Sequence, residues 1–318
     1  MLAAVPANAE HALHQLEAAP GAIADAGRAA VHRMMAPAPH PVAAHPEQHR
    51  GTTHPAAVGP RAQTVDGDSE SVAVHGVPFL RRPNEASAIA PTDVIQGHLG
   101  DCWLLAALAA MARADPASIQ HLIHDLGDHK YEVTLYTGAN NKEGVGTPEK
   151  FVVDDQFAAA HGTARGARSD VTSPWGPELW VRIIEKAMAV KKHGYDGLVA
   201  LDRGLTARLT SGLDLLQNKG HVDRYVLETL SEADVLPHIV DGFANHRPMT
   251  SLSTWRPYSG KQKVITFHQY TVSGVDMAKR TVSLQNPWGS HHVEDMPIED
   301  YVITFESLEI GPKLGAHA

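Results

Sequence analysis

Apolar positions follow regular spacings from about residue 77 onward, and the first part of that stretch contains a strong helical signal. The run from Cys102 to Arg113 is almost entirely apolar, which predicts a buried helix that ends before Pro116. Two shorter segments lack this helical pattern. Tyr131–Tyr136 alternates between apolar and polar residues, and Phe151–Val153 consists of aromatic and β-branched residues. Both segments predict strands.

A second helix is expected from Pro177 to Lys192, because its apolar residues recur at helical spacing. Pro177 suits the first turn of a helix and Gly194 lies just past its end, which is the usual asymmetry of these two residue types. The apolar face consists of Leu179, Ile183, Ile184, Ala187 and Met188.

The later chain has the pattern of strands. We expect them at Lys263–Val275, Thr281–Gln285 and Tyr301–Ile310, with a turn at Met277–Arg280. A helical half followed by a β-rich half predicts an α+β fold of two lobes with a cleft between them.

The first 75 residues have a different composition from the rest. The first aromatic residue is Phe79, and the opening sixty residues contain eight prolines, seven histidines and many alanines. Such a segment buries too little apolar surface to offset the entropy of folding, so residues 1–75 are expected to be largely disordered. A weak helix between Ala9 and Met35 is the one exception.

Composition excludes several classes of protein. The net charge of −9 argues against nucleic-acid binding, since phosphate neutralisation needs a basic surface. One cysteine permits no disulfide within the chain. No apolar run approaches the length of a membrane span, and no signal peptide is evident. A cytoplasmic location is the default expectation, with secretion that does not use a signal peptide left open.

The single cysteine lies in a chemically suggestive place. A glycine and Asp101 precede Cys102, and an apolar helix begins there, so the partial positive charge of the helix N-terminus would stabilise a thiolate. Its backbone N–H and the side-chain amide of Gln96 could then bind an oxyanion. Taken singly, Cys102 would be a buried structural thiol, Asp101 a helix cap and Gln96 an ordinary loop residue.

A histidine and an asparagine complete the candidate site. His268 lies on an expected strand, and Asn286 follows eighteen residues later in Asn-Pro-Trp-Gly, far enough for the chain to return beside the histidine. Asn286 would orient the imidazole, and Trp288 would shield their hydrogen bond from water. Each signal is weak alone, since a strand histidine is usually structural and Asn-Pro-Trp-Gly also suits a plain turn. Together they match a Cys–His–Asn arrangement.

The segment from Gln96 to Trp103, Gln-Gly-His-Leu-Gly-Asp-Cys-Trp, resembles the nucleophile motif of calpains almost letter for letter. Val152–Asp155, the Pro177–Ala189 helix with its Glu-Lys-Ala, and the block from His268 to Gly289 are similar to the same family.

The resemblance extends over about residues 77–314, and among the departures from the family is one beside the histidine. The family has glycine there and this chain has Phe267, a bulky side chain that is expected to narrow the cleft.

The resemblance implies a papain-like, two-lobed cysteine peptidase fold. Residues 76–205 would form the first lobe with Cys102, and residues 206–318 the second lobe with His268 and Asn286. It also implies a thiol endopeptidase that acts on protein or peptide substrates, with Gln96 in the oxyanion hole.

Calpain cores resemble one another in having a calcium site in each lobe, which implies Asp93 and Glu178 as first-lobe ligands. Taken alone, Asp93 would be a solvated loop carboxylate, and Glu178 a favourable charge in the first turn of a helix. The family's long loop in the second lobe is short here, between Gly289 and Tyr301. We therefore expect no required cofactor, no second-lobe site and at most weak calcium binding in the first.

Two other functions use the same residues. A transglutaminase-like enzyme would transfer an acyl group to an amine, although an asparagine rather than an aspartate at residue 286 favours the peptidase. A non-catalytic calpain-like binding module would retain the fold alone, although the presence of all four catalytic residue types argues against it. The natural substrate and the oligomeric state are left open.

Overall fold

The computed structural model describes residues 62–63, 70–83, 85–137, 144–200, 211–218, 220–255, 258, 260 and 262–315. The expected helix between Ala9 and Met35, and most of the N-terminal segment predicted to be disordered, lie outside these residues. Within them, every helix is too short or too polar to cross a lipid bilayer.

The described chain before residue 220 combines helices with short strands. Its helices are η1 (Pro91–Asp93), α3 (Cys102–Ala114), α4 (Pro116–Gln120), α5 (Trp180–Lys191), α6 (Tyr195–Ala200) and α7 (Gly212–Leu216). Its strands are β1 (Ser71–Ala73), β2 (Ile123–Gly127), β3 (Lys130–Thr137), β4 (Thr147–Asp154), β5 (Gln156–Ala160), β6 (Thr163–Ala164), β7 (Thr172–Ser173) and β8 (Gly176–Pro177). The strands form the antiparallel sheets β1-β5-β6, β2-β3-β4 and β7-β8.

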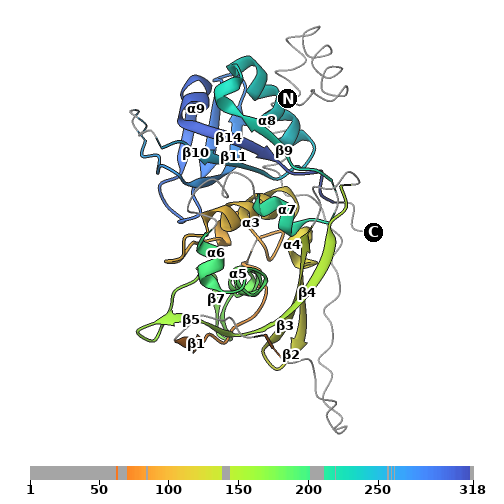
Figure 1. The fold of residues 1–318 in the computed structure, drawn as a ribbon. Helices are drawn as coiled ribbons and strands as arrows, with labels where there is room; N and C mark the ends of the chain where they lie inside the picture. The colour runs from red at the N-terminus through yellow and green to blue at the C-terminus, as the bar shows by residue number, and fades with distance from the viewer. Residues whose placement is uncertain are drawn as a thin grey trace.

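The later chain forms a six-stranded antiparallel sheet in the order β13-β12-β11-β10-β14-β9 among the described residues. Its elements are β9 (Asp223–Val226), η2 (Leu227–Thr229), α8 (Glu232–Ala244), β10 (Met249–Ser253), β11 (Gln269–Asp276), β12 (Thr281–Gln285), β13 (Val293–Pro297), α9 (Ile298–Thr304) and β14 (Phe305–Ile310). Figure 1 shows this sheet with α8 and α9 at one end of the molecule, and β1 to β5 at the other.

Helix α3 lies between these two parts (Figure 1). Its alanines from Ala106 to Ala112 are buried, and such small side chains let neighbouring backbones approach closely. Thr271 of β11 donates a hydrogen bond to the Ala106 carbonyl at 2.7 Å. On another side α7 approaches so closely that a Cβ at Gly212 would lie 2.6 Å from the Trp103 carbonyl oxygen. The apolar run predicted as a buried helix is therefore buried against both parts of the chain.

Within the described part of the chain, two separate clusters of buried side chains form the core. One is built on α3, α5 and the β2-β3-β4 sheet, and the other on α8, α9 and the six-stranded sheet. The first cluster also contains Leu213, Leu216 and Val222, so side chains after residue 206 pack with the first part. The α+β class is as expected, and the division at residues 205–206 stays a prediction.

The second helix begins three residues later than predicted, because its expected first turn is used in strand-like pairing. Pro177 belongs to β8, and its carbonyl accepts a hydrogen bond from Val77 N–H at 3.1 Å. Glu178 N–H donates to Val171 O at 2.9 Å. The helix therefore starts at Trp180, and Glu178 precedes it instead of lying in its first turn.

Two expected strands are shorter than predicted. The strand expected at Lys263–Val275 begins at Gln269, because Phe267 has a left-handed φ of +51° that interrupts extended structure. His268 therefore lies immediately before β11 and not on a strand. Tyr301 belongs to α9, which follows Pro297 and carries acidic residues in its first turn, an arrangement that favours a helix start.

The end of the segment predicted to be disordered is part of the fold. Ser71–Ala73 pairs with β5, and Val74 N–H donates to Asp155 O at 3.0 Å. This three-residue strand is mostly exposed, so it has almost no hydrophobic pattern, and only its pairing with a distant strand orders it.

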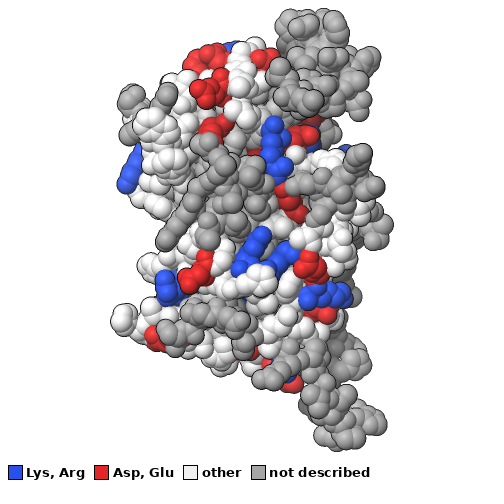
Figure 2. Space-filling model, viewed as in Figure 1, with Lys and Arg blue, Asp and Glu red and all other residues white. Residues whose placement is uncertain are grey.

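On the face drawn in Figure 2, the described Lys and Arg side chains are interspersed with Asp and Glu.

Candidate active site

Cys102 is the first residue of α3 and is 4% exposed. The helix starts with the hydrogen bond from Leu104 N–H to Asp101 O at 2.9 Å, so the N–H groups of the first turn are directed toward the Cys102 end. Asp101 is the N-cap residue of this helix, as its alternative role required, but its side chain makes no capping hydrogen bond. The position still favours a thiolate at Cys102.

His268 and Asn286 lie together in the buried interior. His268 Nε2 is 2.9 Å from Asn286 Oδ1, and the two residues are 5% and 0% exposed. The Trp288 ring lies 4.9 Å from the imidazole, and its backbone N–H donates to the same Asn286 oxygen at 2.9 Å. This is the arrangement expected of an asparagine that orients a histidine beside a tryptophan.

The hydrogen bond determines the chemistry of the imidazole. Because the Asn286 carbonyl oxygen can only accept, Nε2 carries the proton and Nδ1 of the neutral ring is a base. Burial lowers the pKa of His268 to about 4, and the bond to Asn286 opposes this only in part. At neutral pH His268 is therefore uncharged unless a thiolate lies beside it.

Tyr270 connects the two halves of the candidate site. Its ring packs edge-on against His268 with centroids 5.1 Å apart. Burial raises the pKa of its hydroxyl to about 12 against the opposing hydrogen bond from Ile265 N–H, and the nearby charge of Cys102 makes a smaller contribution in the same direction. The same ring is thus close to the histidine and within the electrostatic reach of the cysteine.

Gln96 lies beside the Asn286 turn. Its backbone N–H donates to Pro287 O at 2.7 Å, and its side chain is 9% exposed. The side-chain amide donates to Leu99 O at 2.6 Å and lies 3.4 Å from Asp101 Oδ1. In this arrangement the amide is engaged within its own loop, so an oxyanion-binding role needs it to rotate.

Phe267 lies beside the histidine but is 58% exposed. Its positive φ explains why glycine suits this position, since a side chain is strained there. The ring contacts solvent, and the narrowing of the cleft stays a prediction.

Asp93 and Glu178, the predicted calcium ligands, are both buried, which excludes a solvated loop role for Asp93. Asp93 accepts from Ala90 N–H at 2.6 Å and lies 3.0 Å from the Arg82 guanidinium. Glu178 accepts from Leu80 N–H at 2.8 Å and from the Ser169 hydroxyl at 2.9 Å.

Burial, together with the negative charge of Asp93, raises the pKa of Glu178 to about 7, although the hydrogen bond from Leu80 N–H opposes the shift. Arg82 already supplies a positive charge to Asp93, and both carboxylates accept protein hydrogen bonds. The residues present therefore fit calcium poorly without rearrangement, because the ion needs six to eight free oxygen ligands.

Sequence reasoning missed a pair of buried carboxyl groups next to the cysteine. Glu185 of α5 is 1% exposed, hydrogen-bonds to Asp101 and accepts from Ala167 N–H at 2.8 Å. Burial raises the pKa of Glu185, so the pair holds a proton more tightly than a solvated carboxyl does. The sequence contained one signal for this residue, because Glu185 lies beside the apolar face of the predicted amphipathic helix.

We expect Glu185→Gln to stabilise the fold at neutral pH, because the amide can accept from Ala167 and donate to Asp101 without a second charge. Because the pKa of Glu185 is higher in the folded chain than in the unfolded chain, the wild-type glutamate destabilises the fold once the pH exceeds its pKa in the unfolded chain. This cost grows as the pH rises further. Thermal unfolding should therefore show a gain of about 3 °C near pH 8 and less near pH 5. Exposed Glu228→Gln is the control, and a loss of stability at both pH values would contradict the prediction.

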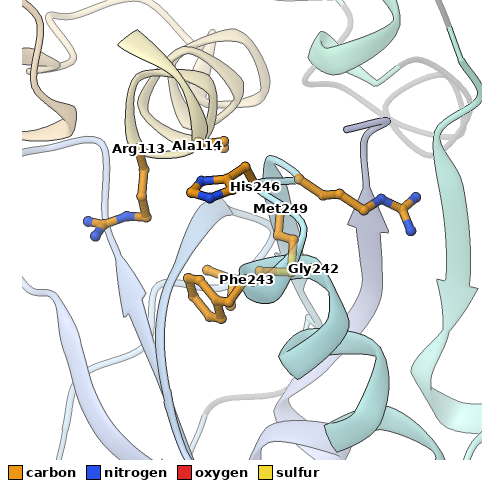
Figure 3. A pocket seen from close by; sticks show the side chains of 9 residues that line it. Arg113, Ala114, Gly242, Phe243, His246 and Met249 are labelled. Atoms are coloured by element: carbon orange, nitrogen blue, oxygen red, sulfur yellow. The ribbon is translucent and has the colours of Figure 1, made fainter. Parts of the chain in front are cut away.

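A small pocket elsewhere does not contribute to this site. It lies between the C-terminal end of α3 and the α8–β10 connection, where Ala114, Phe243, His246 and Met249 line it (Figure 3). The Arg113 guanidinium points away from the pocket in Figure 3 and donates to Gln285 at 3.0 Å.

Comparison with known proteins finds a matching family and several similar sequences. The sequence profile of the family described as calpain family cysteine protease matches residues 80–295, a range that includes Cys102, His268 and Asn286. The chain is 25% identical to calpain-8 of Mus musculus over 209 residues, and 28% and 26% identical to the calpain-2 catalytic subunits of Bos taurus and Gallus gallus over 219 residues. Each match covers 62% of this chain and 28% of the relative, so the chain spans just over a quarter of these relatives.

Proposed function

Because this chain belongs to the calpain family of cysteine proteases, we propose that it is a cysteine endopeptidase that hydrolyses peptide bonds in exposed, extended segments of proteins. The observation that carries the proposal is the buried 2.9 Å hydrogen bond between His268 and Asn286. The two separate core clusters support a papain-like arrangement of two lobes with α3 at their boundary.

In this proposal Cys102 is the nucleophile, His268 the general base and acid, and Asn286 the residue that holds the imidazole in the productive tautomer. Nδ1 of His268 takes the proton of the Cys102 thiol, and the resulting thiolate attacks the carbonyl carbon of the substrate peptide. Trp288 packs against the imidazole and limits the access of water to the bond with Asn286. The buried and neutral state of the imidazole supports a base that acts when the substrate arrives.

The oxyanion that forms would accept hydrogen bonds from the Cys102 backbone N–H and from the Gln96 amide, once that amide has turned from Leu99. The carbon–nitrogen bond then breaks as the imidazolium protonates the leaving amine. Water, deprotonated by His268, hydrolyses the thioester and releases the carboxylate product and the free thiol.

Product analysis on an unfolded protein substrate tests this function against its alternatives. A peptidase generates new N-termini, whereas a transglutaminase-like enzyme releases ammonia and incorporates an added amine. A thiol-reactive inhibitor should label Cys102 stoichiometrically and stop the reaction, since the chain has no other thiol. Full-length chain that is labelled slowly and yields neither product would contradict the proposal and favour a binding module.

We expect the hydrolysis rate to depend little on calcium, changing by less than about threefold between chelator and millimolar ion. The reason is that Arg82 and backbone donors already occupy the carboxylates of Asp93 and Glu178. Rates measured against free calcium, with calorimetric titration, check this, and Glu178→Gln should remove any small response. Steep, cooperative activation with two bound ions would prove it wrong.

A further inference from the structure

We infer that His75, His129 and Asp155 form a binding site for a divalent transition-metal ion of the zinc type, distinct from the residues proposed for catalysis and for calcium. The three side chains come from three separate segments near the β1–β5 end of the molecule (Figure 1).

The backbone brings these segments together. Asp155 lies between β4 and β5, and its carbonyl accepts from Val74 N–H at 3.0 Å, which places His75 next to it. The β3–β4 pairing sets Lys130 opposite Asp154, which places the β2–β3 turn and His129 on the same side. His129 has a left-handed φ of +57° in that turn. The site therefore depends on strand register rather than on chance contacts of long side chains.

The potential ligand atoms are already close. Asp155 Oδ2 lies 2.6 Å from His75 Nδ1 and 3.2 Å from His129 Nδ1, and all three ligand atoms lie within 4.8 Å of one another. Tetrahedral zinc with bonds of about 2.0–2.1 Å separates its ligand atoms by about 3.3 Å. Shifts on the order of 1 Å would satisfy this geometry.

The exposure of the two imidazoles leaves room for those shifts. The Asp155 side chain is 6% exposed and anchored, whereas those of His75 and His129 are 65% and 56% exposed and free to adjust. Without a metal, both imidazoles converge on one buried carboxylate oxygen.

The ligand set identifies the class of ion. Two imidazole nitrogens and one carboxylate oxygen suit Zn²⁺, Co²⁺ or Ni²⁺, whereas calcium and magnesium prefer oxygen ligands throughout. Three protein ligands leave the fourth position to water or to another donor. Bound metal would fasten the β1 segment to the β2–β3 turn.

The test uses the metal-free full-length chain, with Co²⁺ as spectroscopic probe and Zn²⁺ for calorimetry and thermal unfolding. His129→Ala removes one exposed ligand, and His124→Ala, exposed on the neighbouring strand, is the matched control. The control separates the loss of a specific ligand from the loss of any one histidine. This matters because the opening sixty residues contain seven histidines that can bind metal weakly.

Wild type and His124→Ala should show the visible absorption of tetrahedral cobalt, one tight zinc ion and a raised unfolding midpoint. His129→Ala should lose the cobalt signal and bind that zinc ion at least about tenfold more weakly. Equal stoichiometry, affinity and thermal shift in all three proteins, or the absence of zinc binding by wild type, would overturn the inference. Neither readout depends on peptidase activity, so the result is separate from the test of the proposed function.

Discussion

Replacing Cys102 with alanine is expected to reduce hydrolysis of an unfolded protein substrate by at least about 10³-fold. The proposed reaction passes through a thioester on this sulfur, and the chain has no second thiol that could take its place. The fold should be retained, because the substitution removes one small atom at the first position of a helix whose remaining side chains pack unchanged.

The measurement combines the rate of new N-terminus formation with thermal unfolding of the same preparations. Cys102→Ser is the matched variant, because it retains side-chain size and hydrogen bonding but is a far weaker nucleophile. Both variants should unfold within a few degrees of wild type. A loss of less than about tenfold in rate would remove Cys102 from the role of nucleophile.

Replacing His268 with alanine is expected to cause a loss of similar size, about 10³-fold, because no base would remain to take the thiol proton. Asn286→Ala should cost less, about 10- to 100-fold, since it releases the imidazole from its 2.9 Å hydrogen bond without removing it. Steady-state rates on one protein substrate, with each variant checked for its fold, measure both losses. Activity of His268→Ala near that of wild type would contradict the assignment of the base.

The low pKa of His268 supplies a second readout that does not involve substrate. In the unfolded chain this histidine takes up a proton near pH 6.5, whereas in the folded chain burial delays protonation to about pH 4. Protonation therefore favours the unfolded chain, and wild-type stability should fall as pH drops from about 6.5 to about 4. His268→Gln should weaken this acid-side loss. Parallel stability curves for the two proteins would show that His268 is not buried in its neutral form.

Some features of this protein follow from short stretches of its sequence. The helix from Cys102 was predicted within one residue of its observed end, because an apolar run without glycine or proline has few other ways to bury its side chains. The strand Thr281–Gln285 and the turn before it were likewise predicted from local pattern. Asn286 and His268 were chosen because their chemistry requires those residue types, and they lie in hydrogen-bond contact.

Other features were decided only when distant segments met. Glu178 fell outside its expected helix because the backbone next to it pairs with Val77 and Val171. The strand at Ser71–Ala73 exists through its register with β5.

The same holds for the groups that no pattern indicated. Burial beside Asp101 raised the pKa of Glu185, and His75 meets Asp155 across eighty residues of chain. Local sequence determines which side chains prefer to be buried and where helices and turns can start. Strand register and the approach of two backbones depend on the whole fold. They decided which polar groups share a buried space, and therefore which of these groups have a shifted pKa or lie together as candidate metal ligands.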